Sequence, residues 1–336
     1  MEQRIERVRL PDGTDVAYAV TGSGPVLVYL PGWVSHLELG WAFPAERRFA
    51  EALANGRTLV RYDRPGCGLS GPAPEADLAM LEMEVLDAVI RSVGAQRVDM
   101  LGMSLSAPLA VRWAASHPET VDRLVLYGGW VSGERLGPPR LREHVLGLVK
   151  QHWGLGSKVL TEIFAPDADA AFRAGFSAHQ RESASAETAC RTLAAGYDID
   201  VTDDLARVTA RTTVIHREGD GAVPLAEGRR LAEGIRSASM TVLPGRDHIA
   251  FAGDVDALID GVRRGLGLAV SRRRVLSLTP RQMEVAALVS QGMSNRQIAE
   301  RLVITERSAE SHVERIRSRL GFRSRAQIAA WYVHAG

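Results

Sequence analysis

Short runs of Val, Leu and other apolar residues alternate with amphipathic stretches through most of this chain, and this alternation limits the folds that it can adopt. Stretches between the runs, such as 78–93 and 108–117, have the spacing of helices. Strands that are apolar on both faces are typical of a parallel sheet covered by helices. The pattern therefore predicts an α/β sheet in residues 1–265. The strand-like runs are VLVYL around 27–30, TLVRYD at 58–63, RVDMLG at 97–102, RLVLYGG at 123–129, TTVIHREGD at 212–220 and MTVLPG at 240–245.

About 80 residues without a good strand pattern separate the run at 123–129 from the run at 212–220. They contain helical patterns, including RLREHVLGLVKQHWGLGSKVLTEIF and SAETACRTLAAGYDI. An open α/β sheet binds its ligands at the carboxyl ends of its strands, where an inserted group of helices can cover them. We therefore predict a helical cap at about 132–207.

Charge divides the chain into a mildly acidic body and a basic tail. Residues 266–336 hold 12 arginines against 5 acidic residues, a balance of +7, whereas the preceding residues hold 29 basic and 35 acidic side chains, or −6. The stretch GLGLAVSRRRVLS at 265–277 is rich in turn-forming residues and arginine, which is typical of a linker. The predicted boundaries are 1–265 for the body, 266–276 for the linker and 277–336 for a small second domain.

The N-terminal segment and the cysteines argue against a secreted, membrane-bound or metal-binding protein. MEQRIERVRLPDG is charged where a signal peptide needs an apolar stretch, and no apolar run approaches the roughly 20 residues that cross a bilayer. Cys67 and Cys190 are too few for a disulfide framework and lack the spacing of a zinc site. We expect a soluble, cytoplasmic protein with no metal, no cofactor and no membrane partner.

A serine occupies the position of a nucleophile in a strand–turn–helix motif. In VDMLGMSLSAPLAVRWAA, Ser104 is the central residue of a G-x-S-x-G pattern whose last glycine is replaced by Ser106. A serine hydroxyl attacks a carbonyl when a histidine accepts its proton and a carboxylate orients that histidine. Asp220 in EGDGAVP and His248 in LPGRDHIAF follow in the required order, each after a predicted strand. The sequence therefore predicts a catalytic triad of Ser104, Asp220 and His248.

Two backbone N–H groups complete the predicted site. An oxyanion hole takes one donor from the residue after the nucleophile and one from an early strand-to-loop turn. Leu105 follows the nucleophile, and YLPGW at 29–33 is the early turn. We expect the donors to be the N–H groups of Leu105 and Trp33.

These motifs, together with RYDRPGCGLS at 61–70, GDGAVP and GRDH, resemble those of the α/β-hydrolase superfamily over about residues 1–265. The resemblance implies an α/β-hydrolase sheet with a helical cap and a small-molecule ligand or substrate. The family's His-Gly is Pro31-Gly32 in this chain, so the glycine that permits close approach is kept.

The basic tail divides into four short helices by its caps and turns. Pro280 follows the cap residue Thr279, Gly292 ends the first helix, Ser294 or Asn295 caps the second, and Thr305 opens the third. A small core is predicted from apolar residues at helical spacing, namely Ile298, Ala299, Leu302, Ala309, Val313, Ile316 and Leu320.

The third of these helices carries polar residues opposite its apolar stripe. A solvent-facing helix that follows a short helix and a turn fits the major groove of DNA, with side chains near its N-terminus at base edges. The candidate DNA contacts are Arg307, Ser311, Glu314, Arg315 and Ser318.

Residues 278–333 resemble the LuxR-type helix-turn-helix domain, on the strength of GMSNRQIAERL and RLGFRSRAQ. The resemblance implies DNA as a partner and a homodimer, because the last helix, here 325–333, often pairs two subunits in that family. Family members commonly have Thr-Val where this chain has Ser308-Ala309.

Two functions of different classes fit this combination. One is a one-component transcriptional regulator whose hydrolase body senses, and in one version hydrolyses, a small ester, lactone or similar ligand. The other is a serine esterase or lactonase whose tail serves mainly for dimerisation or localisation. Hydrolase folds also serve as receptors that keep their triad, so enzyme activity stays open. The fusion favours the regulator, because no receiver-like phosphorylation domain precedes the tail.

Several other conspicuous residues have structural interpretations. Asp63 and Arg64 lie beside PGCG at a strand end and are expected to fix a loop. The histidines at 36, 117 and 216 have no partner at an informative spacing. The aromatic residues of the predicted cap are interpreted as core or pocket lining, namely Trp153, Phe164, Phe172 and Phe176.

Overall fold

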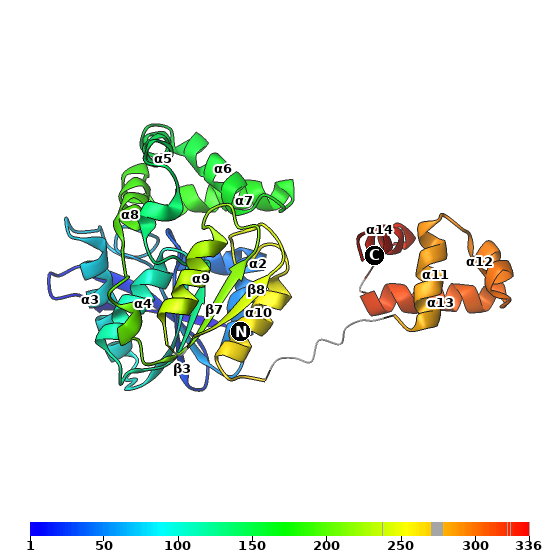
Figure 1. The fold of residues 1–336 in the computed structure, drawn as a ribbon, viewed down its shortest axis with the longest axis horizontal. Helices are drawn as coiled ribbons and strands as arrows, with labels where there is room; N and C mark the ends of the chain where they lie inside the picture. Colours follow the sequence, from blue (N-terminus) through cyan, green and yellow to red (C-terminus); the bar gives the residue numbers. More distant parts are fainter. Residues whose placement is uncertain (237, 270–277, 321, 323, 336) are drawn as a thin grey trace. The chain divides into compact units, whose positions relative to one another are not determined.

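The computed structural model describes residues 1–236, 238–269, 278–320, 322 and 324–335. The chain divides into two compact units, Met1–Ala269 and Val270–Gly336, each of which is described by itself (Figure 1). The predicted linker at 266–276 lies outside the described residues from position 270 on. Leu266 is buried in the first unit, which therefore continues past residue 265 to Ala269.

The first unit is built on an eight-stranded sheet in the order β1-β2-β4-β3-β5-β6-β7-β8. Neighbouring strands from β4 to β8 in that order pair in parallel, whereas β2 pairs antiparallel with both β1 and β4. The strands are β1 (Gln3–Arg9), β2 (Asp15–Gly22), β3 (Val26–Leu30), β4 (Thr58–Tyr62), β5 (Val98–Met103), β6 (Val121–Tyr127), β7 (Arg211–Arg217) and β8 (Ala238–Leu243).

The hairpin of β1 and β2 is not among the strands predicted from the sequence. It lies at an edge of the sheet, and β1 shows only half-buried and exposed side chains instead of an apolar run. The Asp12-Gly13 turn between two alternating stretches is the signal that identifies such a hairpin.

Helices cover both faces of this sheet. In β3, Leu27 packs with apolar residues of α2 and α10, whereas the next residue, Val28, packs with those of α3 and α4 on the other face. This alternation explains why the strand is apolar at every position. The helices are α1 (Leu37–Ala42), α2 (Pro44–Ala54), α3 (Leu78–Ser92), α4 (Ser106–Ser116), α9 (Leu225–Gly234) and α10 (Val255–Gly265).

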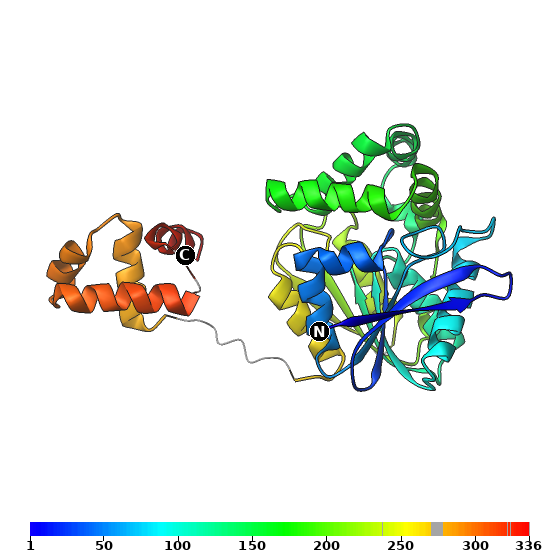
Figure 2. The same cartoon turned by 180° about the vertical axis from the view of Figure 1, so that it is seen from behind.

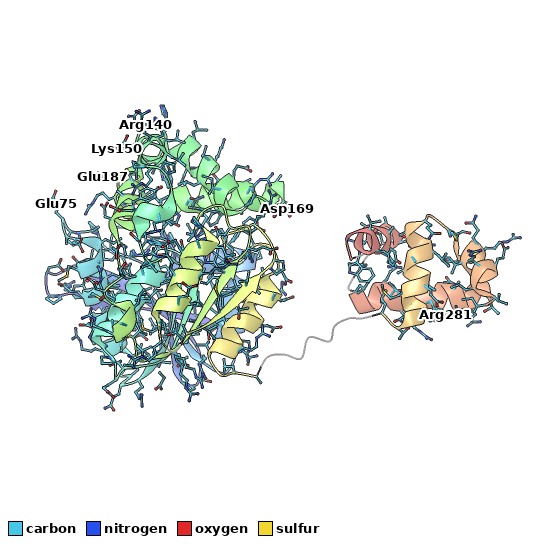
Figure 3. The ribbon with its side chains drawn as sticks, viewed as in Figure 1. Glu75, Arg140, Lys150, Asp169, Glu187 and Arg281 are labelled. Atoms are coloured by element: carbon cyan, nitrogen blue, oxygen red, sulfur yellow. The ribbon has the colours of Figure 1, made fainter. Side chains whose placement is uncertain are left out.

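A group of helices joins β6 to β7 and lies above one end of the sheet, as Figures 1 and 2 show. Its charged residues Arg140, Lys150 and Glu187 point outward (Figure 3). The elements of this cap are η1 (Gly133–Leu136), α5 (Pro139–Gln151), α6 (Trp153–Phe164), α7 (Ala170–Ser183), α8 (Ala186–Asp198) and η2 (Leu205–Arg207).

The described residues of the second unit form four helices around a small core. Thr279 and Ser294 are the N-caps of the first two, and each forms a capping box with the glutamine three residues on. Ile298, Val313 and Ile316 are buried in the core. The helices are α11 (Pro280–Ser290), α12 (Asn295–Leu302), α13 (Glu306–Leu320) and α14 (Arg325–Ala335).

Candidate active site

Ser104 lies on the tight turn between β5 and α4. Its φ is +51°, in the left-handed region that a residue with a side chain adopts only when its surroundings hold it there. The Ser104 N–H donates to the carbonyl of Tyr127 at 2.8 Å. Gly102 allows the close approach of the following helix, because a Cβ at this position would lie 2.8 Å from the carbonyl oxygen of Ser106. The turn therefore raises Ser104 above the end of the strand.

The three predicted triad residues lie in one hydrogen-bonded chain. The Nε2 atom of His248 is 2.7 Å from Oγ of Ser104, and its Nδ1 atom is 2.7 Å from Oδ2 of Asp220. The three residues follow β5, β7 and β8, whose ends meet at one edge of the sheet. Gly128, which follows β6, leaves room for the imidazole, because a Cβ there would lie 2.9 Å from Cε1 of His248.

The Asp220 carboxylate is held by its own loop. Its Oδ1 atom accepts hydrogen bonds from the N–H groups of Ala222 at 2.9 Å and Val223 at 3.0 Å. Burial opposes its ionisation, but the charge and hydrogen bond of His248 and the hydrogen bond from the Val223 N–H keep the pKa of Asp220 below its usual value. The carboxylate is therefore charged at neutral pH and can stabilise an imidazolium.

His216 lies beside the same carboxylate, although the sequence offered no partner for it. Its Nε2 atom is 3.8 Å from Oδ2 of Asp220 and 2.9 Å from the carbonyl oxygen of Val223. The four-residue spacing to Asp220 crosses a turn, where spacing alone does not identify a contact. Burial lowers the pKa of His216, which favours its neutral form.

The predicted oxyanion residues Trp33 and Leu105 both line the cavity that contains Ser104. The three carbonyls of the loop 31–33 all accept hydrogen bonds from the Arg64 guanidinium, at 3.0, 2.8 and 3.1 Å. Because the C=O and N–H of a trans peptide point in opposite directions, the carbonyl before Trp33 turns the Trp33 N–H away from Arg64. Arg64 thus fixes a loop, and that loop contains the predicted donor.

Arg64 is buried and belongs to a larger network. Its Nε donates to Oε2 of Glu82 at 3.0 Å, and the other oxygen of Glu82 accepts a hydrogen bond from the Tyr62 hydroxyl. Ser106 accepts a hydrogen bond from Arg64 and donates one to the carbonyl of Pro31. The serine that replaces the last glycine of the motif therefore links the nucleophile turn to the loop 31–33.

A second buried arginine holds the histidine loop. Arg217 ends β7 and donates to the carbonyls of Asp247 at 2.5 Å, Ile249 at 3.3 Å and Ala252 at 2.6 Å, which flank His248 in sequence. Arg217 is not among the site residues predicted from the sequence, because there it looks like the polar end of a strand. An arginine at the end of an otherwise buried strand is the signal that could have identified it.

The cap is bonded directly to the same loop. The carbonyl of Phe164, the last residue of α6, accepts hydrogen bonds from the N–H groups of His248 at 2.7 Å and Ile249 at 3.1 Å. The Phe164 ring also lies 5.6 Å from the imidazole of His248. A movement of α6 would therefore act on the loop that carries His248.

A cavity of about 210 Å³ has Ser104 and His248 in its wall and is also lined by residues of the cap. Leu141 of α5 lines it and is 54% exposed. The wall is mostly apolar, and its cap residues include Leu136, Val145, Leu160, Ile163, Phe164, Phe176 and Leu193. The arrangement suits a small ligand with apolar parts and a carbonyl carbon near Ser104.

The predicted DNA contacts lie on α13 of the second unit. Arg307, Glu314 and Arg315 are exposed and Ser311 is half-buried, whereas Ala309 on the opposite face is fully buried. Glu314 also accepts a hydrogen bond from Arg317 at 2.9 Å. The side chain of Ser318 lies outside the described residues. The DNA contacts stay predictions.

The two thiols are free, and burial raises the pKa of Cys67 to about 11 and the pKa of Cys190 above its usual value. Both are therefore protonated at neutral pH and poor nucleophiles. Within the described ranges, His, Cys, Asp and Glu form no cluster of three that could hold a metal ion. No helix among those same residues is long and apolar enough to span a membrane.

Comparisons with known proteins identify both parts of the chain. Residues 27–260 match the model of the alpha/beta hydrolase family, and residues 276–332 match that of the luxR family of bacterial regulatory proteins. Both resemblances predicted from the sequence are thus confirmed, as is the α/β-hydrolase fold with a helical second domain.

Individual relatives are hydrolases. The chain is 29% identical over 248 residues to a 2-hydroxy-6-oxononadienedioate/2-hydroxy-6-oxononatrienedioate hydrolase of Cupriavidus pinatubonensis, covering 71% of this chain and 82% of the relative. It is 27% identical to the pyrrolizixenacetamide deacetylase of Xenorhabdus hominickii, and the match covers 71% of this chain and 90% of the relative. A hydrolase from Pseudomonas aeruginosa PA01 has a similar fold, with a TM-score of 0.68, 22% identity and coverage of 79% of this chain and 98% of that one. The chain therefore belongs to the alpha/beta hydrolase family and carries a LuxR-type helix-turn-helix domain after its hydrolase domain.

Proposed function

We propose that this chain is a one-component transcriptional regulator whose hydrolase domain binds a small ester, lactone or similar carbonyl compound and whose C-terminal domain binds DNA in response. One observation carries the proposal: a hydrogen-bonded chain of Ser104, His248 and Asp220 faces a capped cavity in the same polypeptide as a LuxR-type domain. The hydrolase domain is the available sensor, because it contains the cavity.

The proposed chemistry is acyl transfer to Ser104. The Nε2 atom of His248 accepts the Ser104 proton as Oγ attacks the carbonyl carbon of the ligand, and Asp220 stabilises the imidazolium. The developing oxyanion accepts hydrogen bonds from the N–H groups of Trp33 and Leu105. His248 then protonates the departing alkoxide oxygen, and a water activated by the same histidine releases the acyl group.

The proposed DNA contacts are the polar residues of α13. Arg307 and Arg315 are exposed and carry the positive charge that phosphates and guanine edges attract. We propose a homodimer paired through α14, so that two copies of α13 meet two half-sites of an operator. Ser311, Glu314 and Ser318 complete the proposed contact set.

Labelling with a fluorophosphonate probe tests the role of Ser104. We expect covalent labelling of the wild-type chain, because His248 activates the hydroxyl, and no labelling of Ser104→Ala. Ser116→Ala, at an exposed serine that ends α4, is the matched control and keeps the label. Labelling that persists in Ser104→Ala, or a wild-type chain that never labels, rejects the nucleophile.

A serine esterase or lactonase whose C-terminal domain serves mainly for dimerisation or localisation is the second candidate. The complete hydrogen-bonded triad favours it, because a receptor needs the cavity but no aligned proton acceptor. Specific DNA binding that changes with ligand supports the regulator. Fast ester hydrolysis with no specific DNA binding supports the enzyme.

A further inference from the structure

A second group of polar side chains faces the cavity that contains Ser104. Glu46 of α2, Arg61 of β4 and His179 of α7 all line it. The Oε1 atom of Glu46 is 3.7 Å from a terminal guanidinium nitrogen of Arg61, and its Oε2 atom is 4.0 Å from Nε2 of His179. Both distances exceed that of a hydrogen bond. Within the part of the chain that the structure describes, the Glu46 carboxyl group therefore has charged and polar neighbours but no hydrogen-bond donor.

This group is shielded from bulk water. The side chains of Arg61, His179 and Glu46 are 5%, 8% and 15% exposed. The His179 ring lies between two aromatic rings, 6.5 Å from that of Phe43 and 6.2 Å from that of Phe176. Burial raises the pKa of Glu46 to about 7 and lowers the pKa of His179 to about 4. Polar groups in such a place are stabilised by a ligand that supplies the missing hydrogen bonds.

The charges in the group restrict what that ligand can carry. When Glu46 is ionised, it and Arg61 have opposite charges, so an additional carboxylate or ammonium group would be attracted by one and repelled by the other. Arg61 donates from a terminal nitrogen to Oε1 of Gln3 at 2.6 Å, but its buried Nε has no partner among the described residues, and Glu46 accepts nothing from them. The group therefore lacks a donor for Glu46, an acceptor for Nε of Arg61, and an acceptor or donor for His179. A hydroxyl or a carboxamide can both donate and accept without adding charge.

We propose that Glu46, Arg61 and His179 form a polar subsite that binds an uncharged hydroxyl or carboxamide at the far end of the ligand, while the ligand's carbonyl group lies at Ser104. This inference rests on the proposed function, since it specifies the ligand of the same cavity. The apolar wall between the polar groups takes a hydrocarbon segment, so the ligand is an acyl compound with an apolar middle and a polar tip. His179 belongs to the cap, whereas Glu46 and Arg61 belong to α2 and β4. The polar tip of the ligand would therefore bond to both the cap and the sheet layer.

Matched pairs of p-nitrophenyl esters test the subsite on the full chain. Each pair has an acyl chain of four, six or eight carbons that ends either in a methyl group or in a hydroxyl group. We expect one chain length at which kcat/KM favours the hydroxyl ester by about tenfold or more, because the hydroxyl bonds to groups that are otherwise unpaired. Glu46→Leu and His179→Phe are expected to abolish this preference, and Glu46→Gln to retain part of it. Glu187→Gln, on the outer side of the cap, is the matched control and keeps it.

Two results overturn the subsite: equal kcat/KM for both members of every pair in the wild-type chain, or a preference that survives both Glu46→Leu and His179→Phe. Fluorophosphonate labelling of each variant shows whether Ser104 is still activated, so a damaged triad is distinguished from a lost subsite. If no ester is hydrolysed, the hydrolytic part of the proposed function fails. The subsite is then tested by calorimetry, which measures the affinity of Ser104→Ala for both esters of each pair. Equal affinities for the methyl and hydroxyl esters reject the subsite.

Discussion

The two domains hold their functional side chains in opposite ways. In the hydrolase domain, Ser104 and His248 depend on loops whose carbonyls are bound by the buried arginines Arg64 and Arg217. In the C-terminal domain, Arg307 and Arg315 are exposed on the surface of a helix. Acyl transfer needs reacting atoms fixed within a fraction of an ångström, whereas a DNA contact needs a side chain free to meet its partner. Arginine therefore stabilises the hydrolase domain from within, whereas the proposed DNA-contacting arginines of the other domain lie at its surface.

Among these substitutions, removing a buried arginine is expected to change the free energy of unfolding the most. Arg64→Ala leaves Glu82 buried without its ionic partner, and we expect it to lower the free energy of unfolding of the hydrolase domain by about 3–5 kcal/mol. Arg296→Ala is the matched control, because Arg296 is 77% exposed and pairs with Glu300 across one helical turn. It is expected to change stability by no more than about 0.5 kcal/mol. Urea denaturation measures both, and equal effects would remove the contrast between the domains.

The pH dependence of stability tests the buried acid of the cavity. The folded-state pKa of Glu46 is raised from 4.5 to about 7, so between these values the folded chain binds more protons than the unfolded chain, and stability falls as pH rises. Glu46→Gln removes this loss and gains up to about 3 kcal/mol relative to wild type between pH 5 and pH 8. His179, whose pKa is lowered, acts in the opposite direction at lower pH but is common to both proteins. Identical pH dependence in the two proteins contradicts a raised pKa of Glu46 in the folded chain.

Substitution on the surface of α13 has the smallest expected effect on stability. Arg307→Ala is expected to leave the free energy of unfolding within about 0.5 kcal/mol of wild type, because the side chain is exposed. Its operator affinity should fall by about 1–3 kcal/mol, with relaxed preference at one base position. Gel-shift titrations against the operator and its single-base variants measure the affinity and the base preference. Unchanged affinity and preference would show that Arg307 does not face the groove.

Most of the sheet was predictable because parallel strands are locally apolar. The triad candidates could be chosen because each follows a predicted strand in a fixed chain order. The edge strand β1 could not be chosen in this way, since its exposed and half-buried side chains form no apolar run, although its partner β2 is largely buried. Apolar runs and chain order thus predict the central strands and the order of the site residues, whereas the edge hairpin has the Asp12-Gly13 turn as its signal.

The contacts that support the site could not be predicted from the sequence, because they join residues that are far apart along the chain. Arg64 bonds both to the loop at residues 31–33 and to Ser106, which are far from it in the sequence. Glu46 likewise lies near His179, which belongs to a cap helix. No periodicity or spacing encodes such contacts, which depend on how the elements pack. The replacement of the motif glycine by Ser106 was visible in the sequence, but its partners were not.

In the proposed regulator, the state of the cavity changes DNA binding. Its most direct test is a gel-shift titration of the full chain on an operator selected from random-sequence duplexes, before and after modification by a fluorophosphonate, with Ser104→Ala treated identically. We expect that filling the cavity at Ser104 changes operator affinity by about 5–150-fold and that Ser104→Ala shows no such change. Equal operator affinities for the modified and unmodified wild-type chain would contradict it.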